Sequence, residues 1–595
     1  MTDGDPRPGS GTGSAPGSGP SPAAGAAPDP DRAYRSPRAL APDESSLAPE
    51  ERHRPGDGPL LPVAEAWGGP LGKHAVVGRQ RWVTPLRVVL LFAVIFLAFG
   101  FFSKAGCLET THPTDGSEPS LMWDGRQYYK ACYADPIPLW GVEGLSQGAF
   151  PYKFGWVEGE GADQITRYME YPVLTGLWQY ASAQVALGWD HLQHMGALPG
   201  PIPVIKYFSV VVVGMAFFWL LAVWATYRST GRRPWDTLFM AASPLVIFQA
   251  FTNFDAMAVA ASALALMFWS RRMPKWAGFA IGIGVAMKLY PLFLFGALLV
   301  VALRARKYVD LLWAICVAVL TWSVVNLPIA LLFPEGWREF FRLNNDRPQN
   351  PESIYAAISG LTSWGGFDAP GEIPSTLNTV SLVLFAAGCV GVLAIGLTAR
   401  KTPRIAQLAF LIVAIFLLTN KVWSPQYSLW LVPLAVLAIP RARVLLPWMV
   451  FDALLWVAHM SYFAGTESKG LNPEWFHLLV LIRDGLVVYV CAAIVWEIYR
   501  PSRDLVRRWH ADLPGGDPLL GTLAPGGGDG GDADAAVRES FDVSGEFGGR
   551  APVAPRRRPV VARADGAAGA RAKTTGGRAK TTARSTAEQK AAGDE

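Results

Sequence analysis

The sequence predicts an all-α polytopic membrane protein, and three observations lead to that fold class. The 595 residues are 51% hydrophobic and only 17% charged. The apolar residues occur in long runs, and the first, Thr84 to Phe102, can cross a hydrocarbon core of about 30 Å. Lys and Arg recur between these runs in the pattern that the positive-inside rule describes. The first run begins too far from Met1, and is too long, for a cleaved signal peptide.

The two ends of the chain are expected to be disordered cytoplasmic tails. Residues 1–80 and 511–595 are rich in Gly, Pro, Ala and Ser and hold too few apolar side chains to bury a core. The basic run Arg556 to Arg558 in the second tail admits contact with anionic lipid or a purely solubilising role. The net charge of +5 indicates no nucleic-acid partner, because much of the positive charge lies in tails and short loops.

Charge distribution orients the first spans. Arg87, with the cations before it, places the N-terminus inside, and the loop 103–202 carries five Lys and Arg against eleven Asp and Glu, as suits the outside. The weaker run Tyr171 to Gly188 is expected to be an interfacial helix on the membrane surface, because its apolar residues share one face. A further span there would also break the alternation, since Ile202 to Tyr227 must return the chain to the inside.

The remaining runs alternate in the same way. We expect about twelve transmembrane helices within residues 84–500, a second long outer loop at 334–378, and both termini in the cytoplasm. Pro291 should divide the run Trp276 to Leu303 into two short spans, because proline removes a backbone donor. The other expected spans are Trp235 to Phe251, Ala256 to Trp269, Leu311 to Phe333, Val380 to Leu397, Ile405 to Thr419, Ser428 to Ile439, Val444 to Phe463 and Trp475 to Tyr499.

This ordering brings unusual polar residues to the outer membrane surface. Ionisable groups at membrane depth are costly and are often functional, so their convergence predicts a site there. The residues are Asp124, Asp255, Lys288, Asn344, Asn345, Asp346, Arg347, Lys421, Gln426 and Tyr427.

Each candidate also has a structural interpretation. Asp124 could accept a proton from a sugar hydroxyl or could cap a short helix, and Asp255 could orient a hydroxyl or a metal or cap the helix at Ala256. Lys288 could bind a lipid phosphate or snorkel from a helix end. Lys421 could meet a phosphate or a sugar oxygen while Trp423 stacks on a sugar face, or both could belong to an interfacial turn.

The cysteine content leaves one question open. Cys107 and Cys132 both lie in the first outer loop, where a disulfide is possible if that loop faces the oxidising side. The other cysteines, Cys316, Cys389 and Cys491, lie in apolar runs and are expected to be packing residues.

Motifs of soluble enzymes are missing from the sequence. It contains no P-loop, no Gly-rich dinucleotide fingerprint after a strand, and no Cys/His zinc spacing. No segment is large enough for a nucleotide-sugar domain, which favours a donor dissolved in the membrane.

In their order, several short motifs resemble the GT-C glycosyltransferases, and among these glycosyltransferase family 87, the actinobacterial polyprenyl-phosphate-mannose-dependent mannosyltransferases. The resemblance covers roughly residues 84–500 and implies a GT-C-like bundle with outer-face loops and interfacial helices. The motifs are the aromatic-flanked Asp124, Gly148 to Tyr152, Glu170-Tyr171-Pro172, Asn253-Phe254-Asp255, Gly284 to Pro291, and Lys421 to Tyr427. The sequence departs from the commoner family pattern at Val173, where a second proline is frequent.

The resemblance implies an inverting transfer at the outer face from a polyprenyl phosphate sugar, most simply mannose, to a lipid or cell-envelope acceptor. Asp124 would be the catalytic base, and no metal or other cofactor is implied. The donor phosphate would bind Arg126, Lys288 and Lys421. Substrate-binding candidates are Asp255, Tyr290, Asn345, Arg347, Trp423, Gln426 and Tyr427.

Two other functions fit a polytopic membrane protein. A transporter or flippase of lipid-linked sugars should carry its polar residues near mid-membrane on broken helices, whereas here they gather at outer helix ends. A non-catalytic membrane scaffold would have no need for Asp124.

Overall fold

The computed structural model describes residues 83–111, 118–159, 161 and 164–524 of the chain. The predicted tail 1–80, and the predicted C-terminal tail from residue 525 onward, lie outside the described residues. Within them the protein is helical apart from one two-stranded antiparallel sheet, β1 (Trp156–Glu158) and β2 (Ile165–Arg167). The expected all-α class is therefore confirmed for this part of the chain.

Six described helices are long and apolar enough to cross a membrane. They are α3 (Pro85–Lys104), α7 (Pro203–Tyr227), α13 (Val309–Leu332), α16 (Ser375–Thr398), α19 (Ala442–Phe463) and α20 (Pro473–Tyr499). Shorter apolar helices pack among them: α10 (Asp255–Ser270), α12 (Leu294–Ala305), α17 (Ile405–Thr419) and α18 (Ser428–Ala438). The protein is thus a multi-helix membrane protein, and the predicted number of twelve spans is not confirmed.

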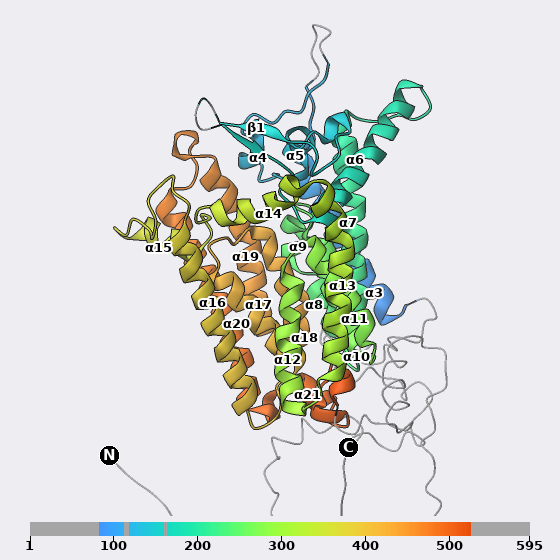
Figure 1. The fold of residues 1–595 in the computed structure, drawn as a ribbon, viewed down its shortest axis with the longest axis vertical. Coiled ribbons are helices and arrows are strands. Elements are labelled where there is room, and N and C mark those ends of the chain that lie inside the picture. The colour runs from blue at the N-terminus through green and yellow to red at the C-terminus, as the bar shows by residue number, and fades with distance from the viewer. Residues whose placement is uncertain (1–82, 112–117, 160, 162–163, 525–595) are drawn as a thin grey trace, which may run out of the picture. The chain divides into compact units, whose positions relative to one another are not determined.

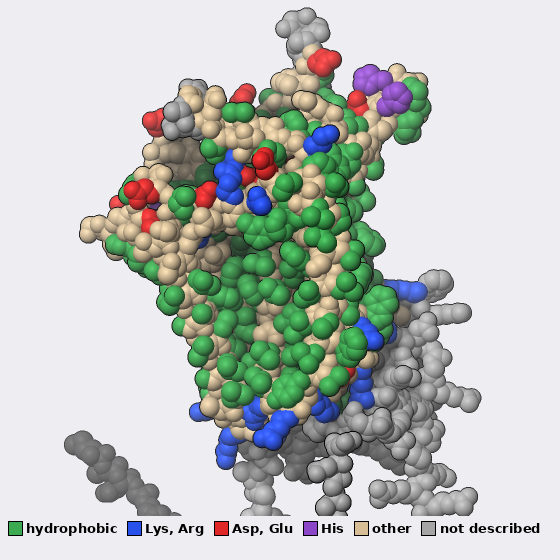
Figure 2. All heavy atoms as spheres, viewed as in Figure 1, with side chains coloured by type: hydrophobic (Ala, Val, Ile, Leu, Met, Phe, Trp, Pro, Cys, Tyr) green, Lys and Arg blue, Asp and Glu red, His purple; other side chains and the backbone are tan. Residues whose placement is uncertain are grey.

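The surface chemistry suits a bilayer. Lys and Arg gather at one end of the helices, both signs of charge appear at the other end, and the flank between them is apolar (Figure 2). Large apolar side chains such as Leu331 on α13 and Leu382 on α16 remain 72% and 66% exposed, as lipid-facing residues would be. We call the basic end the inner end and the opposite end the outer end.

Two predicted spans are discontinuous. The segment 235–251 is broken into η5 (Pro234–Thr237), α8 (Leu238–Ala241) and α9 (Pro244–Gln249). Pro244 has no backbone N–H to continue α8, which separates α8 from α9. The predicted division at Pro291 is observed: α11 (Pro274–Met287) ends before η6 (Tyr290–Phe293), and α12 follows.

Small residues let α11 and α13 approach closely. A Cβ on Gly278 would lie 2.2 Å from the carbonyl oxygen of Ala314, and one on Gly282 would lie 2.6 Å from that of Ala318. Both contacts are with backbone, which cannot yield as a flexible side chain can. The two glycines therefore set the contact between these helices.

A layer of short elements covers the outer end (Figure 1). From the first outer loop come η2 (Ala105–Cys107), α4 (Arg126–Tyr129), α5 (Pro136–Val142), η3 (Leu145–Gln147), the β1–β2 hairpin and α6 (Val173–His194). Later loops add α14 (Pro334–Asp346), α15 (Ile354–Leu361), η7 (Pro425–Tyr427) and η8 (Thr466–Ser468).

Helix α6 differs from the surface helix expected at 171–188. It packs against α7, and its buried face holds the polar residues Thr175, Gln179 and Ser182, while Val185 of the apolar set is 58% exposed. A long-range bond contributes to this burial: the Thr175 hydroxyl donates to the Met287 carbonyl at 2.8 Å. The helix is not among the candidate membrane spans, and its position on the membrane surface stays a prediction.

The inner end is closed by the segment after α20. It forms η9 (Pro501–Arg503), α21 (Leu505–Trp509), η10 (Pro514–Gly516) and η11 (Gly521–Leu523), so residues 511–524 are ordered, where a disordered tail was expected. Buried Arg404 donates to Asp504 at 2.8 Å, and Asp517 accepts from the Ile405 backbone at 2.9 Å. These bonds tie the segment to the start of α17.

The topology can be tested by cysteine labelling. Ser468 lies exposed at the outer end and Ser502 exposed at the inner end. In a variant without the three free cysteines, Ser468→Cys should react in intact cells with a membrane-impermeant maleimide, whereas Ser502→Cys should react only after permeabilisation. Labelling of Ser502→Cys in intact cells would reverse the orientation argued here.

Candidate active site

An ion pair joins the outer ends of α10 and α11. These helices form a hairpin through the short connection 271–273, so the first residue of α10 and the residue after α11 lie at the same end. The Lys288 ammonium lies 3.3 Å from the Asp255 carboxylate, and the two side chains are 15% and 1% exposed. Trp430 donates its indole N–H to the other Asp255 oxygen at 2.7 Å. The observed partners of Asp255 are therefore Lys288 and Trp430, and its side chain makes no cap bond at the start of α10.

Aromatic rings surround the Lys288 ammonium. It lies 5.0 Å from the centroid of the Tyr427 ring and 5.7 Å from that of Tyr171. Trp430 stacks on Tyr427 at 4.1 Å and on Tyr290 at 4.5 Å, which fixes the cage from behind. Ring faces stabilise a cation without neutralising it. An ammonium has three donors, and only the bond to Asp255 is observed among the described residues, so Lys288 keeps capacity for an anionic ligand.

The carboxyl group of Asp135 belongs to the same polar network. It accepts a hydrogen bond from the Asn253 amide, which also donates to the Tyr171 hydroxyl at 2.9 Å. Burial raises the pKa of Asp135 to about 6, while bonds from Tyr133 and Asn253 act in the opposite direction. Asp135 was not predicted from the sequence. The feature that could have indicated it is an acidic residue of the outer loop that directly precedes Pro136, the first residue of α5.

Asp124 lies on an exposed turn above the outer end of the helices. Gly125 follows it with φ of 77°, a conformation that favours glycine, and serves as N-cap of α4 without a side-chain bond. The capping role considered for Asp124 is therefore not observed. The α4 residue Tyr128 stacks on Phe463 of α19 at 6.3 Å, which seats the turn on the bundle.

The part of the first outer loop that follows Asp124 is fastened to the segment after α3. Cys107 and Cys132 form the disulfide that the sequence left open. The Arg126 guanidinium donates to the Gly106 carbonyl at 2.6 Å and pairs with Glu109. Arg126 thus anchors the loop, and no contact brings it to Lys288 within the described residues.

Residues of the two later polar loops meet each other. The Lys421 ammonium donates to the Asn345 carbonyl at 3.0 Å, and the Lys421 carbonyl accepts from the Asn350 backbone at 2.8 Å. Burial, and then the charge of Arg347, lower the pKa of Lys421 to about 8. Arg347 itself lies 3.9 Å from Glu170, the residue before Tyr171 of the cage, so these loops reach the edge of the Lys288 site.

Two predicted substrate-binding residues are enclosed. Trp423 is 1% exposed, and the Arg483 guanidinium covers its ring at 3.7 Å, so its ring is not offered to a sugar in this conformation. Gln426 is 5% exposed. A buried polar cluster lies next to the loop 420–427. In this cluster His459 contacts Glu352 at 2.5 Å.

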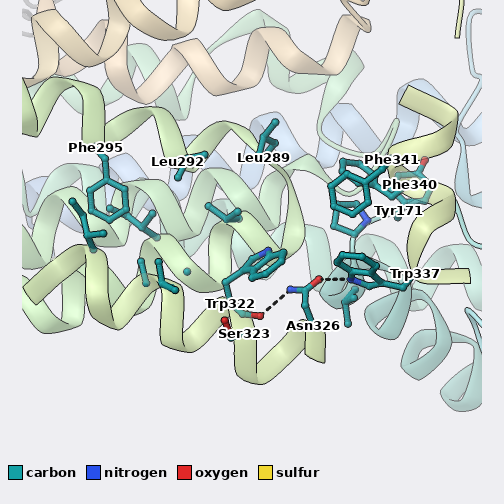
Figure 3. Close-up of a pocket in the computed structure, with 18 of the residues that line it drawn as sticks. Tyr171, Leu289, Leu292, Phe295, Trp322, Ser323, Asn326, Trp337, Phe340 and Phe341 are labelled. Atoms are coloured by element: carbon teal, nitrogen blue, oxygen red, sulfur yellow. Dashed lines mark hydrogen bonds between the residues drawn. The ribbon is translucent and has the colours of Figure 1, made fainter. Parts of the chain in front are cut away.

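An apolar cavity of about 620 Å³ opens beside the cage (Figure 3). It lies between α11, η6, α13 and α14 and includes Tyr171 of the cage and Leu289, the neighbour of Lys288. Its polar lining is sparse: Ser323, and Asn326, which accepts from the Trp337 indole at 3.1 Å. The cavity suits a hydrocarbon chain whose polar end lies near Lys288.

Helix α14 forms the outer wall of this cavity through its apolar face. Trp337, Phe340 and Phe341 point toward the cavity (Figure 3). On the opposite face the buried Glu339 lies 2.9 Å from the guanidinium of Arg167 in β2 and also pairs with Arg342. The β hairpin therefore holds this amphipathic helix in place.

The structure thus brings some of the predicted site residues together around the Lys288–Asp255 pair. Lys288, Asp255, Tyr290 and Tyr427 share direct or stacked contacts, and Asn345, Arg347 and Lys421 form the neighbouring edge. Asp124 and Arg126 lie in the layer above. No group of three or more His, Cys, Asp or Glu with metal-binding geometry occurs among the described residues.

Comparison with known proteins identifies the family to which part of the chain is similar. Residues 195–420 match the family model described as Glycosyltransferase family 87. The match confirms the resemblance over this region, which contains Asp255, Lys288, Asn345 and Arg347, while Asp124 lies outside it. No curated protein matches the chain.

Substitutions in the Lys288–Asp255 pair should change the stability of the protein in a coupled way. Lys288→Met alone leaves the Asp255 carboxylate buried without its cation and should destabilise the protein by about 3–5 kcal/mol. Adding Asp255→Asn removes that charge and keeps an acceptor for Trp430, so the double variant should regain most of the lost stability. Thermal unfolding in detergent measures both, and equal destabilisation of the single and double variants would contradict the coupling.

Proposed function

We propose that this chain, a family 87 glycosyltransferase over residues 195–420, transfers a hexose from a polyprenyl phosphate to a lipid or cell-envelope acceptor at the outer membrane face. Mannose is the sugar that the family resemblance favours. The protein would be a multi-pass protein of the cell membrane with both termini in the cytoplasm.

One observation carries the choice of donor: Tyr171 lines an apolar cavity, and the partly exposed Lys288 ammonium lies 5.7 Å from the centroid of the same ring. A polyprenyl phosphate has a hydrocarbon tail joined to an anionic head, and the cavity and Lys288 match those two parts in that order. A soluble nucleotide sugar would leave the cavity unused. The disulfide in the loop above the site, and the cations at the opposite end, support an outward-facing site.

The proposed chemistry assigns separate roles to the outer loop and the cage. The Asp124 carboxylate takes the proton of the acceptor hydroxyl while that oxygen attacks C1 of the donor sugar. The C1–O bond breaks, its electron pair leaves with the polyprenyl phosphate, and the anomeric configuration inverts. Lys288 stabilises the charge that develops on the leaving phosphate, with Lys421 at the neighbouring edge. Exposure of Asp124 suits a base that meets an acceptor arriving from outside.

The base assignment predicts a defect in the chemical step. Asp124→Asn should lower kcat at least about 100-fold, because general-base catalysis typically contributes that much, and should leave KM for the donor nearly unchanged. The measurement uses purified protein, radiolabelled polyprenyl phosphate mannose and candidate lipid acceptors. Glu118→Gln, which removes another exposed acid of the same loop, is the matched control. Transfer at the wild-type rate by Asp124→Asn would exclude Asp124 as the base.

The cavity predicts a dependence on donor chain length. Ser323 lines the cavity, whereas the next residue, Val324, is 65% exposed away from it. Ser323→Phe should raise KM about tenfold for a long polyprenyl donor, the equivalent of ~1.4 kcal/mol, and should barely affect a donor with one isoprene unit. Val324→Phe should behave like the wild type. An unchanged KM for the long donor in Ser323→Phe would separate the cavity from donor binding.

A further inference from the structure

Asp135 has no role in the transfer described above, although it occupies the same network as Lys288. Its side chain keeps some exposed surface, while its carboxyl group is largely surrounded by protein. The charges of Lys288 and Glu170 both act on it. It is the N-cap residue of α5, which belongs to the outer layer of short elements (Figure 1).

The backbone around Asp135 is clamped to the loop that precedes α10. The Asp135 backbone N–H donates to the Thr252 carbonyl at 2.8 Å. Lys104 joins the same two segments, because its ammonium donates to the Tyr133 carbonyl at 2.8 Å and to the Thr252 hydroxyl at 2.9 Å. The position of Asp135 relative to Lys288 is therefore set by buried hydrogen bonds.

The orientation of Asn253 leaves acceptor capacity on Asp135. The Asn253 side-chain oxygen accepts from the Phe254 backbone at 2.5 Å, so its nitrogen is the end that donates to Asp135 and Tyr171. An ionised carboxylate offers about four lone-pair sites and only accepts hydrogen bonds. Ligands that supply several O–H donors at such a carboxylate are polyols, and sugars are foremost among them.

We propose that Asp135, oriented by Asn253, binds a hydroxyl of the sugar being transferred and so determines which hexose the enzyme accepts. This inference rests on the proposed function. With the tail in the cavity and the phosphate at Lys288, the sugar adjoins the contacts that lead from Lys288 through Tyr171 and Asn253 to Asp135. The raised pKa of about 6 still leaves most of this carboxyl group ionised at pH 7.5. Asp135 therefore selects the sugar, while Asp124 acts on the acceptor.

The test pairs the variant with donors that lack single hydroxyls. Polyprenyl phosphate mannose and its 2-, 3-, 4- and 6-deoxy analogues are compared by kcat/KM. The wild type should lose about 10- to 100-fold on one analogue that lacks the bonded hydroxyl, since hydrogen bonds to charged groups have that strength. In Asp135→Asn, kcat/KM for the complete donor should fall by a similar factor. Removing the bonded hydroxyl from the donor should then cause no further fall in kcat/KM. The decreases caused by removing the other hydroxyls should be the same as in the wild type.

Control variants distinguish a direct contact between Asp135 and the sugar from a general effect of the substitution on the fold. Glu143→Gln removes another buried acid of this layer, at the end of α5, and should keep every deoxy penalty. If Asp135→Asn does not fold, Asn253→Ser replaces it and should weaken the same single penalty. If Asp135→Asn or Asn253→Ser loses as much kcat/KM as the wild type on each of the four deoxy donors, the inference is overturned and the proposed function is unaffected. Failure of the wild type to consume any polyprenyl phosphate sugar would overturn both.

Discussion

The ion pair between Lys288 and Asp255 is the constraint around which the outer end of the protein is organised. A charged group at the edge of the bilayer needs a partner, because water cannot fully solvate it there. The α10–α11 hairpin supplies the two charges from opposite ends of its sequence, and Trp430 of α18 joins a third helix to them. Tyr290, Trp430 and Tyr427 then stack in series, so the packing of η6, η7 and α18 depends on the same pair.

The surrounding elements follow from that centre. Tyr171 shares one face of the Lys288 cage with the apolar cavity, and its hydroxyl connects through Asn253 to Asp135. Tyr171 thus lines the cavity, lies beside Lys288, and connects to Asp135 through Asn253. The α14 helix closes the cavity because the β hairpin neutralises Glu339 on its other face with Arg167.

At the opposite end a second set of buried charges holds the bundle together. Arg404, Asp504 and Asp517 join the start of α17 to the segment after α20. Lys307, between α12 and α13, donates to the Ala524 carbonyl at 2.5 Å. Removing Arg404 or Asp504 would leave a buried charge without its ion-pair partner, so the ordered inner segment is integral to the fold.

The sequence by itself determined the membrane class, the break near Pro291, the placing of Lys288 and Asp255 at the same end of their helices, and the family resemblance, because these depend on hydrophobic length, proline chemistry and short ordered motifs. It could not predict which face of α6 is buried, since the bond from Thr175 to Met287 joins residues 112 apart. It also missed Asp135 and did not predict the burial of Trp423. Only tertiary structure brings Asn253 to the first of these side chains and Arg483 to the second, because long-range packing decides which polar groups share a site.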